Sequence, residues 1–265
     1  GSNPLSPTIP LSALRWTALQ DAVMGRETPV ARRVGCVSVA VQSSPEAFLL
    51  TIYGTLRSRT TRVVWAAEEL GLPYRRETVV FASALPDPQA AGAPLNTASA
   101  AFLAVNPMGQ LPAMRDGDLW LGESHAICFY MARKAGGPVA PDGAAEEAEA
   151  LQWAFLAAST IEPQAIEVLY TVMGGTADTA EGKARIAAAL DKLVRPMRRI
   201  ETHLQSHEWL VGGRFTIADI MMEETLRYVA AAPGAFDASP ALKAWFDRCQ
   251  ARPGFQRMWT ARNAE

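Results

Sequence analysis

Asn106-Pro107-Met108-Gly109-Gln110-Leu111-Pro112-Ala113-Met114 is followed closely by Gly122-Glu123-Ser124-His125-Ala126-Ile127. A cis bond between Leu111 and Pro112 would bend the chain sharply, and an X-Pro bond takes the cis form at a cost of only ~0.5 to 1 kcal/mol. The bend would leave the Leu111 N–H and C=O facing outward, where they can pair with an extended ligand backbone as an added strand would. The first segment therefore predicts a cis bond and a backbone-reading edge.

The second segment supplies polar groups for the ends of such a ligand. Glu123 can accept from an ammonium group, while the Ser124 hydroxyl and the free N–H groups of the following helix can hold a carboxylate. Taken singly, Pro112 would be an ordinary trans proline and Ser124 an ordinary helix N-cap. Their order and spacing together favour a site for a small anionic peptide.

These segments resemble the glutathione-binding signature of the glutathione S-transferases, and the resemblance covers about residues 48 to 258. It implies an α/β thioredoxin-like domain followed by an all-α domain. It also implies glutathione as co-substrate, a small apolar electrophile as second substrate and a role in detoxification. Members are mostly homodimers, and many hold the glycyl carboxylate of glutathione with a residue at the position of Gln110.

Composition limits the partners and the compartment. The chain has 265 residues, 49% of them apolar, which suffices for two cores, and its net charge of -2 gives no reason to bind nucleic acid or an anionic membrane. No apolar run is long enough to span a membrane. Cys36, Cys128 and Cys249 lie far apart, and no histidine clusters with them. We therefore expect a cytoplasmic protein without a metal site.

Three regions are predicted: an N-terminal extension over residues 1–47, a thioredoxin-like domain over 48–137 and a helical domain over 143–265. Gly1-Ser2 is typical of a cloning scar. The extension carries residues with helical spacing, Leu11, Leu14, Leu19 and Val23. We expect them to cover an apolar surface of their own chain or of a partner. The alternative is that the segment extends into solvent without contacts.

The thioredoxin-like domain should contain, in order, strand, helix, strand, helix, strand, strand and helix, given its apolar runs and Gly and Pro stop signals. The expected bounds are 48–53, 60–70, 74–81, 99–105, 111–114, 119–121 and 124–135.

Everything after Pro141 should be helical, with helices over 146–173, 179–206, 216–231 and 240–251 and kinks at Pro163 and Pro196. Thr216 and Asp219 form a capping-box variant, to which we assign a structural role.

The loop before the first helix of the thioredoxin-like domain is where a thiol would be activated. A hydroxyl donor and the helix N-terminus can together supply the ~2.7 kcal/mol that lowers a thiol pKa by about two units. Ser58, Thr60 and Thr61 are the candidate donors. Serine-type members of the resembled family place their catalytic Ser four residues before an Arg that opens the helix, as Ser58 and Arg62 do. We favour Ser58 as catalytic, with Thr60 or Thr61 as alternates; as a plain alternative, Ser58 only caps the helix.

The electrophile would be held by apolar side chains such as Tyr170, Met173 and Trp259, although aromatic residues at helical spacing more often pack in a core. The loop holds no Cys, which disfavours disulfide-reductase chemistry. Three functions remain: a glutathione transferase, a glutathione-dependent isomerase or dehalogenase, and a binding protein that kept the fold without turnover. The loop hydroxyls, Leu111-Pro112 and Glu123-Ser124 together disfavour the binding protein, and the transferase is our first hypothesis among the enzymes.

Overall fold

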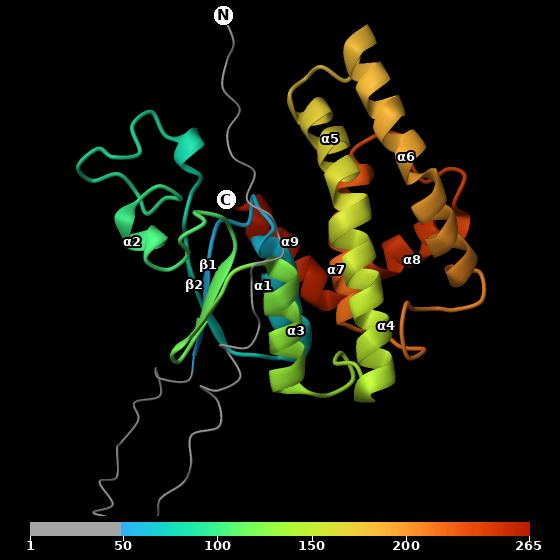
Figure 1. Cartoon of the computed structure of the whole chain (residues 1–265), viewed down its shortest axis with the longest axis horizontal. Helices are drawn as coiled ribbons and strands as arrows, with labels where there is room; N and C mark the ends of the chain where they lie inside the picture. The colour runs from blue at the N-terminus through green and yellow to red at the C-terminus, as the bar shows by residue number, and fades with distance from the viewer. Residues whose placement is uncertain (1–48) are drawn as a thin grey trace, which may run out of the picture. The chain divides into compact units, whose positions relative to one another are not determined.

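The computed structural model describes residues 49–265 (Figure 1). The predicted extension over residues 1–47 lies outside the described residues, so its expected docking stays a prediction. Within the described residues, no helix combines the length and the apolar character needed to cross a membrane.

A four-stranded mixed sheet forms the centre of the thioredoxin-like domain. Its strands are β1 (Leu50–Tyr53), β2 (Tyr74–Glu77), β3 (Ala113–Asp116) and β4 (Leu119–Leu121), in the spatial order β2-β1-β3-β4. β1 pairs in parallel with β2 and antiparallel with β3, which pairs antiparallel with β4. Because strand side chains alternate between faces, Leu50 and Ile52 enter the large core while Tyr53 packs against a small one.

The helices of this domain cover the two faces unequally. α1 (Thr60–Leu70) and α3 (Ser124–Ala135) lie on the side of the helical domain, whereas α2 (Ala100–Leu103) lies on the far side (Figure 1). The element order agrees with the prediction. The second strand is shorter than predicted: it ends at Glu77, and Val80 forms only an isolated bridge with Asn96.

The helical domain differs from the prediction at two places. The expected helix over 146–173 is three segments: α4 (Gly143–Phe155), a π-helical segment (Leu156–Ile161) and α5 (Glu162–Met173). Pro163 lies in the first turn of α5, and a proline has no N–H for the ladder, which accounts for a break here rather than a simple kink.

The remaining helices are α6 (Ala180–Leu204), α7 (Ile217–Val229), α8 (Pro240–Gln250) and α9 (Pro253–Asn263). α6 continues through Pro196. α9 was not predicted, although Pro253 stands at its first turn, a position that favours proline. The capping box of Thr216 and Asp219 is present at the start of α7, which confirms the structural assignment.

The two domains share one core. Trp65 of α1 has no exposed surface, and its ring lies 5.9 Å from Phe215 and 5.1 Å from Phe255, so two aromatic rings of the helical domain pack against a helix of the thioredoxin-like domain. Glu69 of α1 pairs with Arg252 at 2.7 Å. The helical domain therefore holds α1, the helix that follows the predicted catalytic loop, in a fixed position.

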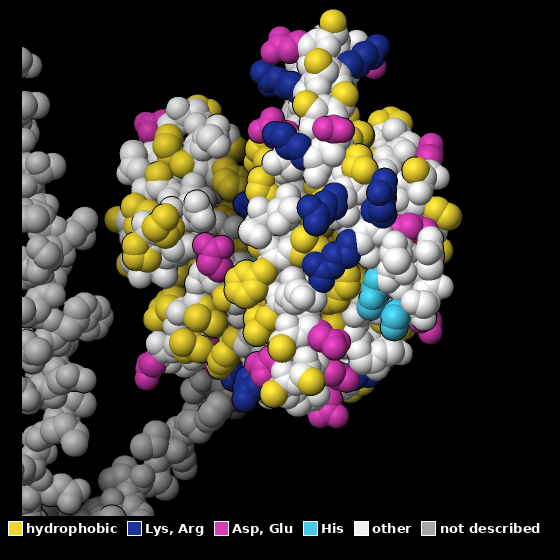
Figure 2. Space-filling model, turned by 45° about the vertical axis from the view of Figure 1, so that its right-hand side comes forward, with side chains coloured by type: hydrophobic (Ala, Val, Ile, Leu, Met, Phe, Trp, Pro, Cys, Tyr) yellow, Lys and Arg dark blue, Asp and Glu magenta, His cyan; other side chains and the backbone are white. Residues whose placement is uncertain are grey.

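The face of the molecule in Figure 2 mixes charged and apolar side chains. Lys and Arg (dark blue), Asp and Glu (magenta) and His (cyan) lie over the helices, and hydrophobic side chains (yellow) lie on both the helical and the thioredoxin-like side.

Candidate functional site

A cavity of about 710 Å³ lies where the two domains meet. Its lining comes from the start of α1, the loop that precedes β3, the start of α3, and the π-helical segment with α5. The lining residues are Arg59, Arg62, Asn106, Met108, Gln110, Leu111, Pro112, Gly122, Glu123, Ser124, His125, Ala126, Ala158, Glu162, Pro163 and Ile166. Every residue predicted to bind the backbone or the ends of the ligand therefore lines one cavity.

The loop before β3 presents a free backbone edge to this cavity. The Leu111-Pro112 bond is cis, as predicted. Within residues 49–265, neither the Leu111 N–H nor its C=O has a hydrogen-bond partner. Asn106 fixes the loop from within, because its side chain donates to the Gln110 carbonyl at 2.8 Å and accepts from the Met108 N–H at 3.1 Å. The Leu111 edge can therefore pair with an extended backbone.

The start of α3 is shaped for an anion. Glu123 precedes the helix with φ 60°, a left-handed conformation that is uncommon outside glycine. Glu123 is thus the N-cap residue, and Ser124 is the first residue of the helix rather than its cap. The Ser124 oxygen accepts from Arg62 Nη1 at 2.8 Å, which leaves its own proton free to donate. That proton and the unpaired N–H groups of the first turn suit a carboxylate.

Arg62 is the main site residue whose role the sequence did not reveal. Its side chain is fully buried, and it donates to the Thr225 hydroxyl at 3.1 Å and lies 3.6 Å from Glu162. Its Nη1 is also 3.2 Å from His125 Nδ1. The spacing of Arg62 from Ser58 was the available signal. Its partners lie up to 163 residues away in the chain, so no local pattern could predict them.

His125 is neutral in this setting. Burial, and then the charges of Arg62 and Arg59, lower the pKa of His125 to about 2. Because a guanidinium only donates, His125 Nδ1 must accept, which places the ring proton on Nε2.

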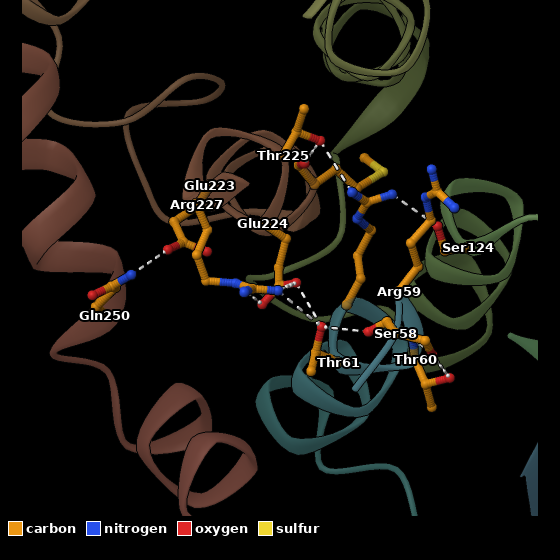
Figure 3. A network of polar contacts seen from close by, with 12 residues as sticks. Ser58, Arg59, Thr60, Thr61, Ser124, Glu223, Glu224, Thr225, Arg227 and Gln250 are labelled. Carbon is orange, nitrogen blue, oxygen red and sulfur yellow. Dashed lines mark hydrogen bonds and ion pairs between the residues drawn. The ribbon is translucent and has the colours of Figure 1, made fainter. Parts of the chain in front are cut away.

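The three candidate hydroxyls of the predicted catalytic loop differ in burial and in hydrogen-bond partners (Figure 3). Ser58 is half-buried, and its Oγ lies 2.7 Å from the Thr55 carbonyl and 2.8 Å from Thr60 Oγ1. Thr60 and Thr61 have no exposed surface, and the Thr61 hydroxyl donates to Glu224 at 2.6 Å. Of the three candidates, Ser58 alone keeps exposed surface, and none of the three is among the residues that line the cavity, whose lining begins at the neighbouring Arg59.

Arg59 and Glu162 join the loop to the helical domain. Arg59 Nε donates to Glu162 Oε1 at 2.5 Å, and both residues line the cavity. Glu162 was not recognised from the sequence because it lies 103 residues from Arg59.

The three aromatic and sulfur-containing side chains predicted to hold an electrophile are not in the cavity lining. Tyr170 and Met173 are 65% and 73% exposed and lie one and two turns beyond Ile166 on the same face of α5. Trp259 instead stacks on Phe255 with ring centroids 5.4 Å apart. Trp259 thus packs on its own helix α9, outside the lining of this cavity, and its predicted contact with the electrophile stays a prediction.

Comparison with known proteins agrees with this geometry. The pattern of the "Glutathione S-transferase, N-terminal domain" matches residues 58–134, and that of the "Glutathione S-transferase, C-terminal domain" matches residues 149–253. "Glutathione S-transferase 1" of Zea mays is 32% identical over 218 residues, which cover 79% of this chain and 95% of the relative. The chain belongs to the glutathione S-transferase family.

Two solved structures of glutathione S-transferases are similar over most of the chain. The theta class enzyme of Xanthomonas axonopodis pv. citri, solved with glutathione bound, is 31% identical with a TM-score of 0.65 and covers 78% of this chain and 95% of its own. Glutathione S-transferase I from mais, in complex with an atrazine glutathione conjugate, is 29% identical with a TM-score of 0.68 and covers 81% and 98%.

The chain also carries a buried acid pair, Glu223 and Glu224, next to the predicted catalytic loop (Figure 3). Burial and the neighbouring Glu224 raise the pKa of Glu223 to about 8, and Gln250 donates to it at 2.8 Å. Burial alone would raise the pKa of Glu224 as well, but the charge and hydrogen bonds of Arg227, with that of Thr61, lower it overall. One proton therefore resides on Glu223 at neutral pH, and Glu224 stays charged between Arg227 and Thr61.

Proposed function

We propose that this protein is a glutathione transferase that holds glutathione as a thiolate with the Ser58 hydroxyl and uses its sulfur to attack a small apolar electrophile. One observation carries the proposal: a single cavity collects the unpaired Leu111 edge and the Ser124 end of α3 beside Arg59, the residue that follows Ser58. The ligands in the two related structures, glutathione and a glutathione conjugate, support it.

In this proposal the tripeptide lies extended across the cavity. Its central backbone pairs with Leu111, and its glycyl carboxylate approaches Gln110. Its γ-glutamyl carboxylate accepts from the Ser124 hydroxyl and the first N–H groups of α3, while Glu123 accepts from its ammonium group. The thiol then falls toward the loop that contains Ser58.

The chemical step needs no protein base. The thiol proton leaves to solvent because the Ser58 hydroxyl, the N-terminus of α1 and the nearby Arg59 and Arg62 favour the thiolate. The sulfur then gives an electron pair to the electrophilic carbon, forming a C–S bond. In a substitution the leaving group departs with its bonding pair, and in an addition the product carbanion takes a proton from water.

The second substrate would lie on the helical-domain wall. Ala158, Pro163 and Ile166 provide a small apolar floor, and Tyr170 and Met173 extend the same face of α5 outward. An isomerase or dehalogenase could use the same site, so a panel of electrophiles, haloalkanes and isomerisable substrates distinguishes these activities.

We also propose a homodimer. Large apolar side chains remain exposed on β4 and α4, namely Leu119, Trp120, Leu151 and Phe155. Such side chains are typical of interfaces when they lie close together. Light scattering on the full chain should give twice the chain mass, and a monomer mass at all concentrations would reject this proposal.

Kinetics of two serine variants test the proposed roles. Ser58→Ala should lower kcat by ~10- to 100-fold with little change in glutathione affinity, because its hydroxyl acts on the developing sulfur charge. Ser124→Ala should instead weaken glutathione binding and raise its KM. Ser206→Ala, at an exposed position after α6, is the control and should behave as the parent.

Calorimetric titration with glutathione separates binding from turnover. If Ser58→Ala left kcat unchanged, the assignment of Ser58 would be wrong. If the parent bound no glutathione at all, the proposed function itself would be wrong.

A further inference from the structure

Glu265 reaches back to the loop that precedes Ser58, more than 200 residues earlier in the chain. Its Oε2 accepts from the Leu56 N–H at 2.7 Å and from the Thr55 hydroxyl at 2.8 Å. Its other oxygen pairs with Arg76 of β2. Arg76 in turn donates to the Gly54 carbonyl at 3.2 Å. Glu265 and Arg76 thus hold three consecutive residues of the loop.

The same contacts continue to the hydroxyl of Ser58. The Thr55 hydroxyl gives its proton to Glu265, so its lone pairs are free to accept from the Arg57 N–H at 3.1 Å. In this structure the Ser58 hydroxyl gives its one proton to the Thr55 carbonyl at 2.7 Å, so this proton must turn from the carbonyl to the sulfur when glutathione binds. The Leu56 N–H and the Thr55 C=O belong to one planar peptide unit, so Glu265, which accepts from this N–H, also fixes the carbonyl beside the Ser58 oxygen.

No other carboxylate in residues 49–265 takes over these contacts. The Leu56 N–H has Glu265 as its single recorded acceptor among these residues, and the Leu56 side chain is buried. Without Glu265 the N–H would lose its partner, and the Thr55 hydroxyl could rotate toward other acceptors. The loop would then lose the contact that fixes Thr55.

We propose that Glu265 is a positioning residue for thiol activation: through Thr55 and Leu56 it holds the Ser58 hydroxyl in the place from which it donates to the glutathione sulfur. This inference rests on the proposed function, because it assigns a second residue to the same step. Glu265 touches neither glutathione nor the electrophile in this account.

An electrostatic role and a positioning role of Glu265 predict opposite shifts of the pKa of the bound thiol when Glu265 is removed. A carboxylate near the thiolate disfavours it by repulsion, so deletion of the charge alone would lower the pKa of the bound thiol. Loss of the Ser58 hydrogen bond would instead raise that pKa. The sign of the shift therefore separates a positioning role from a merely electrostatic one.

The test uses the full chain saturated with glutathione, and it follows the ultraviolet absorbance of the thiolate against pH. Glu265→Ala should raise the apparent thiol pKa by about 1 unit and lower kcat near neutral pH by ~10-fold, with glutathione KM little changed. Glu265→Gln keeps an oxygen for the Leu56 N–H and should recover part of this loss. Glu208→Ala, on an exposed loop, is the control.

An unchanged or lowered thiol pKa in Glu265→Ala would overturn the inference, provided circular dichroism shows the variant folded at the assay temperature. Ser58→Ala is measured in parallel so that the two proposals can fail separately. A raised pKa in Ser58→Ala with none in Glu265→Ala rejects only the role of Glu265. No shift in Ser58→Ala rejects the proposed role of Ser58 and, with it, this inference.

Discussion

Glu223 has a carboxyl group with no exposed surface, and one of its oxygens has no hydrogen-bond partner in the described part of the chain. Burial and Glu224 raise its pKa to about 8 in the folded protein, against ~4.3 for an unfolded chain. Between these two values the folded state binds one proton more than the unfolded state. The free energy of unfolding must therefore fall as pH rises across this range.

Glu223→Gln should remove this contribution. The amide oxygen can still accept from Gln250, and no proton is lost as pH rises. We expect the parent to lose stability relative to the variant by up to ~1.4 kcal/mol per pH unit between about pH 5 and 8. Denaturant titrations at pH 5, 6, 7 and 8 measure this difference, and parallel curves for the two proteins would show that Glu223 titrates normally.

The sequence predicted the residues that bind the ligand backbone and its carboxylate, but it did not predict the buried charged residues beside them. Leu111, Pro112 and Ser124 could be recognised because their function depends on local order and backbone geometry. Arg62 and Glu162 could not, since each acquires its role from partners more than 60 residues away. Glu265 was missed for the same reason.

At the scale of elements, two helix caps show how burial changes the contribution of a capping residue to stability. Asp219 accepts from the Thr216 N–H at 2.9 Å, the Leu210 N–H at 3.1 Å and Trp245 Nε1 at 2.8 Å, all in the core. Thr179 caps α6 near the surface through one bond of 3.0 Å from the Gly182 N–H.

These two caps should differ several-fold in their contribution to stability. Asp219→Ala strands three buried donors and should cost ~3 kcal/mol or more, whereas Thr179→Ala should cost ~1 kcal/mol. At this chain length the corresponding falls in Tm are roughly 2 to 4 °C per kcal/mol. Equal falls in the two variants would contradict a buried, multiply bonded Asp219.

The turn after β1 depends on a glycine. Gly54 has φ 145°, and a Cβ added there would lie 2.1 Å from Thr60 Oγ1, the atom that contacts Ser58. Gly54→Ala should therefore reduce turnover as well as stability. Gly213→Ala is a matched control, because it also has a positive φ (63°) but meets no atom within 4 Å; it should cost about 1 kcal/mol or somewhat more and leave kcat intact. Full activity in Gly54→Ala would show that the turn at Gly54 does not position Ser58.

Element boundaries were predictable where a local signal decides them. The Thr216 capping box and the left-handed Gly71 end of α1 are such signals. The π-helical segment is not, because periodicity over residues 146–173 suits one long helix and the break shows only in the backbone ladder. α9 was not predicted, because a Pro-Gly pair such as Pro253-Gly254 is typical of turns, whereas here Pro253 opens a new helix.

At the scale of the whole molecule, the described residues 49–265 form one compact unit with a core that crosses the two domains. Trp65 and the Glu69–Arg252 pair tie α1 to the helical domain. We therefore expect a single cooperative unfolding transition.

Far-ultraviolet circular dichroism and tryptophan fluorescence of the full chain should give coincident denaturation curves. Two separated transitions would show that the domains unfold independently, and the shared core would then contribute less than its burial suggests.

The central claim is that the Ser58 hydroxyl holds glutathione as a thiolate. The most direct test is the pKa of the enzyme-bound thiol, measured from thiolate absorbance against pH in the parent and in Ser58→Ala at saturating glutathione. We predict a parent value about two units below the ~8.5 of a free thiol and a return toward ~8.5 in the variant. A lowered pKa that persists unchanged in Ser58→Ala would contradict the claim.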